Sequence, residues 1–410
     1  MTWNRRQTLA GAVGISAGAL SGCLNIFTSN ENRPLPESPT GTWLQSAHDA
    51  GNTGASNVTV PERGTPAWNG GSAETIPPLV DEETVYSVGD ALVALDGQTG
   101  EQQWRTNLEV DSSGAPLTQP AVTGEHILLG STGRLMSFDP ADGSKQWTRT
   151  IDGVPIGPMT VAPDLSIGVV PFERPQQDDP VLELVAFSVA SGETEWTAPL
   201  RASVRTTPPA VFDECVYASG YTEDETPILR SFAAEDGALM WERTLDAPTT
   251  PPVATTDGVF IGDDGAVLVY DPKTGEHRTS VAVADRTIRA IAVADVTVFV
   301  LGADGLAAVS ASDGSERWST DGDPQADGLA VGQNTVVAPI SGDAFDLETS
   351  WPCIGALDRI DGTTRWYYAV DDTFDPTISA PPVIADGAVF AMSNTNSGIT
   401  ALGDLPPNEE

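Results

Sequence analysis

Short apolar runs alternate with polar turns along almost the whole chain, and one such unit recurs seven times. In its first copy, the apolar run 92–95 is followed by a turn containing Asp96 and Gly100, and a second run then reaches Trp104. Two such runs joined by a turn rich in Asp and Gly predict a hairpin of two antiparallel strands. Six copies place a tryptophan four residues after the last glycine, namely Trp104, Trp147, Trp196, Trp241, Trp318 and Trp366. The fifth copy has Thr279 there.

Two further short strands precede each copy of this hairpin. Before the first copy, the apolar residues 79–80 and 85–88 flank the turn 81–83. The copies follow one another at spacings of about 40–45 residues, which suits four short strands, and no 3.6-residue period is evident after the N-terminus. The pattern therefore predicts an all-β fold, a propeller of four-stranded antiparallel blades.

The count of inner strands predicts eight blades. These strands begin near residues 77, 119, 157, 208, 251, 289, 328 and 381. The eighth unit ends near residue 402 without an outer strand, whereas residues 66–68 form a spare strand that carries Trp68. We expect this N-terminal strand to complete blade eight, because a closed ring has no open sheet edge. Each tryptophan is expected to dock on the neighbouring blade and to donate its indole N–H to a backbone carbonyl.

The first copy resembles the tryptophan-docking repeat of the pyrroloquinoline-quinone (PQQ) dehydrogenase-like propellers. Ala94, Asp96, Thr99, Gly100 and Trp104 match that repeat completely, and the other copies match in part. Over residues 60–404 the resemblance implies an eight-bladed propeller. It leaves the activity open, because the family contains quinone-dependent alcohol and glucose dehydrogenases as well as non-catalytic lipoprotein propellers of the bacterial outer-membrane assembly machine.

The N-terminus resembles an export signal. Arg5 and Arg6 precede an apolar run, residues 10–20, that is too short for a stable membrane-spanning helix. The run ends in Leu-Ser-Gly-Cys, which resembles a lipobox with Cys23 as the lipidated residue. We expect a twin-arginine signal peptide (1–22), a lipid-anchored flexible linker (23–40), the propeller (41–404) and an acidic tail (405–410).

The charge balance describes the surroundings in which the chain works. It has 58 acidic and 20 basic residues, and a formal net charge of −38. Concentrated salt screens the self-repulsion of such a chain, so we expect a monomeric haloarchaeal lipoprotein on the extracellular face of the cell membrane. Nucleic acid is excluded as a partner, because phosphate binding needs clusters of Lys and Arg.

Candidate groups for catalysis are few. The resemblance to quinone dehydrogenases implies calcium ligands and often an adjacent pair of cysteines, but Cys215 and Cys353 lie in opposite blades. The three histidines, His48, His126 and His277, show no metal-ligand spacing. We therefore expect no metal, no cofactor and no catalytic residue. The leading hypothesis is a non-catalytic binding or scaffolding propeller, and the alternative is a PQQ- and calcium-dependent alcohol or sugar dehydrogenase.

One face of the ring is the expected binding face. The repeats differ in length chiefly between their second and third strands, at residues 173–180, 222–227 and 341–352. These loops share a face with the blade-to-blade connections, and variable loops on a rigid scaffold commonly carry binding. Four arginines in two of those connections form a candidate site for a carboxylate or an acidic peptide: Arg201, Arg205, Arg286 and Arg289. The alternative is that each arginine pairs with a nearby aspartate.

Overall fold

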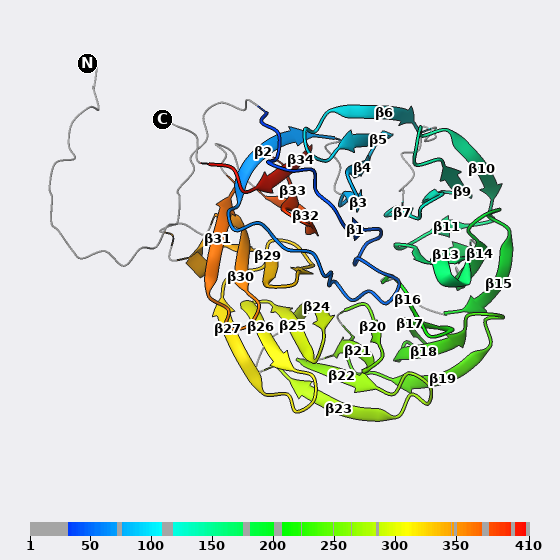
Figure 1. Ribbon diagram of the computed structural model, residues 1–410. Coiled ribbons are helices and arrows are strands. Elements are labelled where there is room, and N and C mark those ends of the chain that lie inside the picture. The colour runs from blue at the N-terminus through cyan, green and yellow to red at the C-terminus, as the bar shows by residue number, and fades with distance from the viewer. Residues whose placement is uncertain are drawn as a thin grey trace, which may run out of the picture.

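The computed structural model forms one closed ring of eight β-sheets (Figure 1). It describes residues 32–406 except 72–75, 109–117, 175–180, 201–206, 223, 249, 264, 284–286, 346, 348–350, 371–376 and 395–397. Each sheet is antiparallel and has four strands, with one extra short strand in blades one and three. The expected all-β, eight-bladed propeller is therefore confirmed.

The strands follow one another from the channel outwards within each blade. Blade one contains β3 (Leu79–Asp81), β4 (Thr84–Val88), β5 (Ala91–Asp96) and β6 (Gln102–Asn107), with β1 (Thr42–Trp43) paired to β3. Blade two contains β7 (Ala121–Val122), β8 (Ile127–Ser131), β9 (Arg134–Phe138) and β10 (Lys145–Thr150). Blade three contains β12 (Thr160–Ala162), β13 (Ile167–Arg174), β14 (Val181–Ser188) and β15 (Thr194–Pro199), with β11 (Val154–Pro155) and the 3-10 turn η1 (Pro163–Leu165). Blade four contains β16 (Ala210–Phe212), β17 (Cys215–Tyr221), β18 (Pro227–Ala233) and β19 (Leu239–Thr244).

The second half of the ring repeats this arrangement. Blade five contains β20 (Val253–Thr255), β21 (Gly258–Asp263), β22 (Ala266–Tyr270) and β23 (His277–Ala282). Blade six contains β24 (Ile288–Ala294), β25 (Thr297–Gly302), β26 (Gly305–Ser310) and β27 (Glu316–Asp321). Blade seven contains β28 (Ala330–Val331), β29 (Thr335–Ser341), β30 (Pro352–Asp358) and β31 (Thr364–Ala369), with the 3-10 turn η2 (Gly342–Phe345). Blade eight contains β32 (Ile378–Ala385), β33 (Ala388–Ser393), β34 (Gly398–Gly403) and β2 (Thr65–Gly70).

The core lies between the blades. The middle strands β26 and β33 are buried at every position, because each blade covers a face of the next. The outer strands, such as β6, expose most of their side chains. Continuous apolar runs therefore became middle strands, and polar alternating runs became outer strands.

The N-terminal strand completes blade eight, as expected. β2 pairs antiparallel with β34, and Trp68 lies opposite Ala401. The turn that joins these strands in the other blades is divided here between the two ends of the chain. Gly64 stands four residues before Trp68, and Asp404 accepts a hydrogen bond from the backbone N–H of Arg63 at 2.7 Å. The eighth hairpin thus closes without a covalent turn.

Seven tryptophans join blades at seven of the eight blade-to-blade joints; the joint between blades five and six has Thr279 instead. Each indole N–H donates to a backbone carbonyl at the third turn of the following blade, at 2.7–3.2 Å. The pairs are Trp68–Gly97, Trp104–Pro140, Trp147–Val189, Trp196–Ala234, Trp241–Pro272, Trp318–Arg359 and Trp366–Pro61. A buried indole keeps its N–H satisfied in this way, so the repeat is primarily a device for joining blades.

The repeat glycine permits a left-handed backbone and leaves room for the docked tryptophan. The joint between blades five and six, which has no tryptophan, separates these two roles. Gly275 has φ +65°, and a Cβ built there would lie 2.5 Å from Trp241. Gly314 has φ +71°, but the nearest atom to its Cβ would be the Cα of Val281 at 3.6 Å, because Thr279 replaces the tryptophan. Both sites require a left-handed backbone, and only the first also requires the absence of a side chain.

We expect Gly275→Ala to destabilise the propeller more than Gly314→Ala. The left-handed backbone costs roughly 1–2 kcal/mol in either variant, whereas only Gly275→Ala forces the alanine methyl into an indole, at about 1–3 kcal/mol more. Chemical denaturation of the two variants measures the difference. Equal losses would show that the indole contact does not restrict this position.

The described part of the expected flexible linker is ordered on the propeller. Residues 32–39 lie on the propeller, where the backbone N–H of Arg33 donates to the carbonyl of Ala67 at 2.8 Å. Leu35 is 2% exposed. A Pro- and Asn-rich segment is thus held by backbone hydrogen bonds and one buried leucine, and the linker prediction does not apply to its described part.

Candidate functional site

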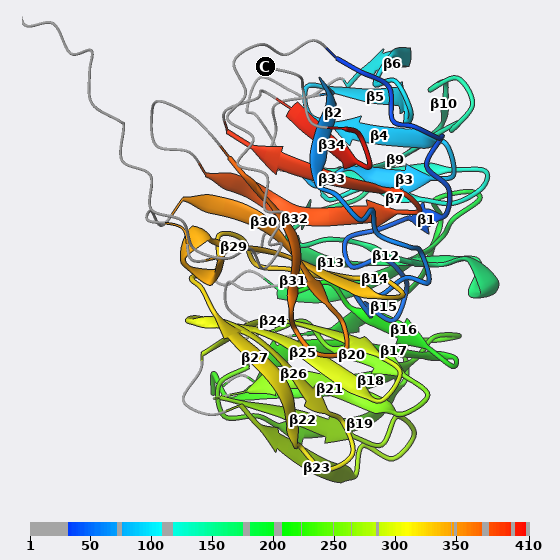
Figure 2. The same ribbon diagram turned by 60° about the vertical axis from the view of Figure 1, so that its left-hand side comes forward.

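A segment of the chain, residues 40–60, crosses one end of the central channel (Figures 1 and 2). We call it the strap. It accepts backbone N–H bonds of 2.6–3.0 Å from the inner part of seven blades, in the pairs Glu82–Gly41, Val122–Leu44, Val211–Ala50, Ala254–Gly51, Val293–Thr53, Val331–Gly54 and Asp386–Thr40. The blade-three inner strand is held by a side chain instead. The strap therefore touches every blade of the ring.

Two buried amide side chains hold the strap in place. Asn52, 3% exposed and with φ +58°, donates through Nδ2 to the carbonyls of Pro208, Pro209 and Pro252 at 3.1–3.2 Å. Gln45, 5% exposed, both accepts from the backbone N–H of Val161 at 2.7 Å and donates to its carbonyl at 3.2 Å. The Asn52 NH2 group and both ends of the Gln45 amide are bonded to backbone, so they join the strap to the inner strands.

A carboxylate turn shapes the middle of the strap. Asp49 accepts bonds from the backbone N–H of Thr53 at 3.0 Å and from its Oγ1 at 2.6 Å, and it lies 3.4 Å from Nδ1 of His48. Burial opposes ionisation of Asp49, but the bond and charge of His48 and the bonds from Thr53 outweigh burial, so its pKa is lowered. The ionised form is thus tied to the local backbone.

The opposite face carries the blade-to-blade connections and the second-to-third strand loops. We call it the rim face. Of the four arginines expected there, Arg289 is described, and its Nε lies 2.5 Å from Oδ1 of Asp327. It therefore follows the alternative of pairing with a nearby aspartate. Arg201, Arg205 and Arg286 lie outside the described residues, as do Arg5, Arg6 and Cys23.

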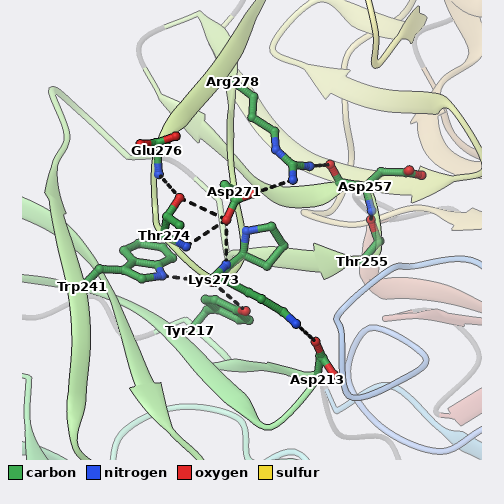
Figure 3. A network of polar contacts seen from close by, with 11 residues as sticks. Asp213, Tyr217, Trp241, Thr255, Asp257, Asp271, Lys273, Thr274, Glu276 and Arg278 are labelled. Carbon is green, nitrogen blue, oxygen red and sulfur yellow. Dashed lines mark hydrogen bonds and ion pairs between the residues drawn. The ribbon is translucent and has the colours of Figure 1, made fainter.

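The joint between blades four and five contains the polar network shown in Figure 3. Trp241 and Tyr217 both donate to the carbonyl of Pro272, at 3.0 and 3.2 Å. The neighbouring Asp271 accepts from the backbone N–H of Thr274 at 2.8 Å and from Arg278 at 2.6 Å. Chiefly the Thr274 N–H, and then Arg278, lower the pKa of Asp271 to about 2. The groups named here find their partners within the network and across the two blades, which indicates a structural joint.

The described residues do not fit a quinone–calcium centre. They contain no cluster of three or more His, Cys, Asp or Glu side chains placed to hold a metal ion. Cys215 and Cys353 are free thiols in blades four and seven, so they are not adjacent. Burial raises the pKa of Cys353 to about 12, which leaves it an unreactive thiol. The Asn and Gln amides at the strapped end of the channel are already bonded to backbone.

Exposed apolar residues form a feature that sequence reasoning missed. Leu239 and Met240 on β19 are each 55% exposed, directly before the docking residue Trp241. The signal was present in the repeats themselves. The two residues before Trp104 are both glutamine, and comparison of such pairs across the blades finds apolar pairs in blades four and eight.

The ring, the tryptophan joints and the repeat turns define a PQQ-repeat β-propeller. The chain belongs to the family described as "Outer membrane protein assembly factor BamB", whose model matches residues 54–224 and 225–409. It is 25% identical over 346 residues to the outer membrane protein assembly factor BamB of Burkholderia pseudomallei, covering 79% of this chain and 83% of that protein.

Solved structures show the same fold. The crystal structure of BamB from Moraxella catarrhalis matches with a TM-score of 0.59 and 12% identity, over 80% of this chain and 96% of that one. Quinohemoprotein alcohol dehydrogenase from Comamonas testosteroni matches with a TM-score of 0.65 and 11% identity, over 90% and 82%. At such identities the likeness concerns the fold alone. Within the described residues, no helix is both long and apolar enough to cross a membrane.

Proposed function

We propose that this protein is a non-catalytic scaffold propeller, held by a lipid on Cys23 at the extracellular face of the cell membrane. The observation that carries the proposal is the strap. One end of the channel is occupied by the chain's own residues, and their buried amides Asn52 and Gln45 bind backbone groups of the inner strands. A partner therefore binds on the rim face or the outer surface.

Membership of the BamB family supports this role. The relatives named as outer membrane protein assembly factors are described as parts of an assembly process, which suits a protein-binding scaffold. The proposed anchor rests on the order of Arg5–Arg6, an apolar run and Cys23 in the sequence. The likeness to alcohol dehydrogenases concerns the fold alone, so it does not favour the quinone-dependent alternative.

Replacing Cys23 with serine should move the protein from the membrane fraction to the medium. Each buried lipid methylene contributes about 0.8 kcal/mol, so two chains anchor a protein stably and their loss should release it. Fractionation of cells that express Cys23→Ser measures the shift, with Cys215→Ser as the matched control. Retention of Cys23→Ser on the membrane would contradict the proposed anchor.

A further inference from the structure

The outer strand of every blade contains the same irregularity. In blade eight, Pro66 pairs with Leu402 and Trp68 pairs with Ala401, so the intervening Ala67 has no partner in the sheet. The register shifts at the corresponding step of the outer strand in all eight blades. Such a bulge leaves the carbonyl of the extra residue available at the outer edge of the blade.

In blade eight this free carbonyl is used by an extended segment of the same chain. Arg33 donates its backbone N–H to the carbonyl of Ala67 at 2.8 Å, and its guanidinium reaches the carbonyls of Pro66 and Pro406 at 3.4 and 3.3 Å. The preceding residue, Asn32, binds β2 through its side chain, which accepts from the backbone N–H of Asn69 at 3.1 Å and donates to its carbonyl at 3.2 Å. Ala67 is 5% exposed under this cover.

The residues beneath the cover are apolar, and only one other blade shares this property. The two positions before the docking tryptophan are Pro66 and Ala67 in blade eight, and Leu239 and Met240 in blade four. In the remaining blades they are Gln102 and Gln103, Lys145 and Gln146, Thr194 and Glu195, His277 and Arg278, Glu316 and Arg317, and Thr364 and Arg365. Polar residues suit an outer strand that faces water.

Blade four has the same bulge, and no segment within the described residues covers its apolar pair. Leu239 pairs with Phe232 and Trp241 pairs with Ser231, which leaves Met240 as the extra residue, equivalent to Ala67. Leu239 and Met240 are each 55% exposed in the described structure. Leu239 and Met240 are neighbours, whereas the other large apolar residues that the described structure exposes, Val296, Trp351 and Ile360, stand singly in the sequence.

We propose that β19 of blade four is the docking site for an extended segment of a partner protein, which lies along its outer edge as residues 32–35 lie along β2. A backbone N–H of that segment donates to the carbonyl of Met240, and its apolar side chains cover Leu239 and Met240. This inference rests on the proposed scaffold role and names the surface that performs it.

The charges around the apolar pair specify a basic partner. Glu235 and Asp236 are exposed in the turn that leads into β19. The nearby arginines are engaged: Arg230 pairs with Glu242 at 2.8 Å, and Arg243 donates to the carbonyls of Gly275 and Thr274. A segment with Arg or Lys beside its apolar residues therefore fits, in the manner of Arg33 in blade eight.

The test compares peptide binding by the full chain and by Leu239→Gln/Met240→Gln, which gives blade four the residue pair of blade one. The probes are fluorescent octapeptides that alternate Leu or Val with Arg, and matched peptides with Glu in place of Arg. We expect the Arg peptides to bind the wild type and to lose at least tenfold in affinity for the variant. The control Glu316→Gln/Arg317→Gln, at the same positions of blade six, should bind as the wild type does.

Equal binding of the Arg peptides to the wild type and to the blade-four variant, or binding to neither, overturns the proposal. A photo-cross-linker at position 239, with position 102 as the control, provides the second measurement on membranes. A position-specific cross-link to a basic, apolar segment of another protein supports the proposal, whereas one to a second copy or to the chain's own N-terminal residues overturns it. The peptide measurement does not depend on the anchor, so a failure of the Cys23→Ser test remains distinguishable.

Discussion

Trp68→Ala is expected to lower the free energy of unfolding of the whole propeller by about 3–5 kcal/mol, the range for a fully buried aromatic side chain. Trp68 is 0% exposed and packs against Phe390 with ring centroids 5.8 Å apart. Its indole also bonds to blade one, so its removal weakens the only non-covalent hairpin at the point where the ring closes. Chemical denaturation at the salt concentration that keeps the wild type folded measures the loss.

Trp147→Ala is the matched control. Trp147 makes the same kind of bond, to the carbonyl of Val189 at 3.2 Å, but it is only partly buried and its blades are joined by continuous chain. We expect a smaller loss there. If Trp147→Ala lowers the free energy of unfolding as much as Trp68→Ala or more, the closing hairpin contributes no more to stability than the other joints.

The blade architecture could be predicted from the sequence because its determinants are local and repeated. Strand, turn and tryptophan follow within thirteen residues in the copy that ends at Trp104, so the eight blades were recognisable without long-range information. The closing role of Trp68 followed from the same spacing. In contrast, Gly64 and Asp404 complete one hairpin from opposite ends of the chain, and no local pattern connects them.

The strap and the exposed pair in blade four were not predicted, for different reasons. The strap binds through backbone carbonyls, such as those of Ala50 and Gly51, which every residue type supplies and which leave no signature in the side chains. Leu239 and Met240 stand at positions that are polar in six other blades, so their signal lay in a comparison of the repeats and not within the single copy. The arginine site stays a prediction, since only Arg289 of its four residues is described; in a chain of 58 acidic residues that arginine pairs with Asp327.

Removal of the strap should produce the largest loss of stability. A chain that begins at Pro61 keeps the Pro61–Trp366 and Trp68 contacts but loses the acceptors of seven inner backbone N–H groups. At roughly 1 kcal/mol for each net hydrogen bond, with the bonds of Asn52 and Gln45 in addition, the loss is on the order of 5–10 kcal/mol. Partial replacement by water in the channel favours the lower end of this range.

Amide hydrogen exchange locates this loss. The N–H groups of Val211, Ala254, Val293 and Val331 should exchange much faster in the shortened chain, whereas those of the middle strands β26 and β33 should change only with global stability. A synthetic peptide of residues 40–60, added in excess, should restore slow exchange at these four amides. Binding of the peptide to the native ring stabilises the ring by mass action. Unchanged protection at those four amides in the shortened chain would show that the inner strands keep their geometry without the strap. The strap would then cover the end of the channel without stabilising it.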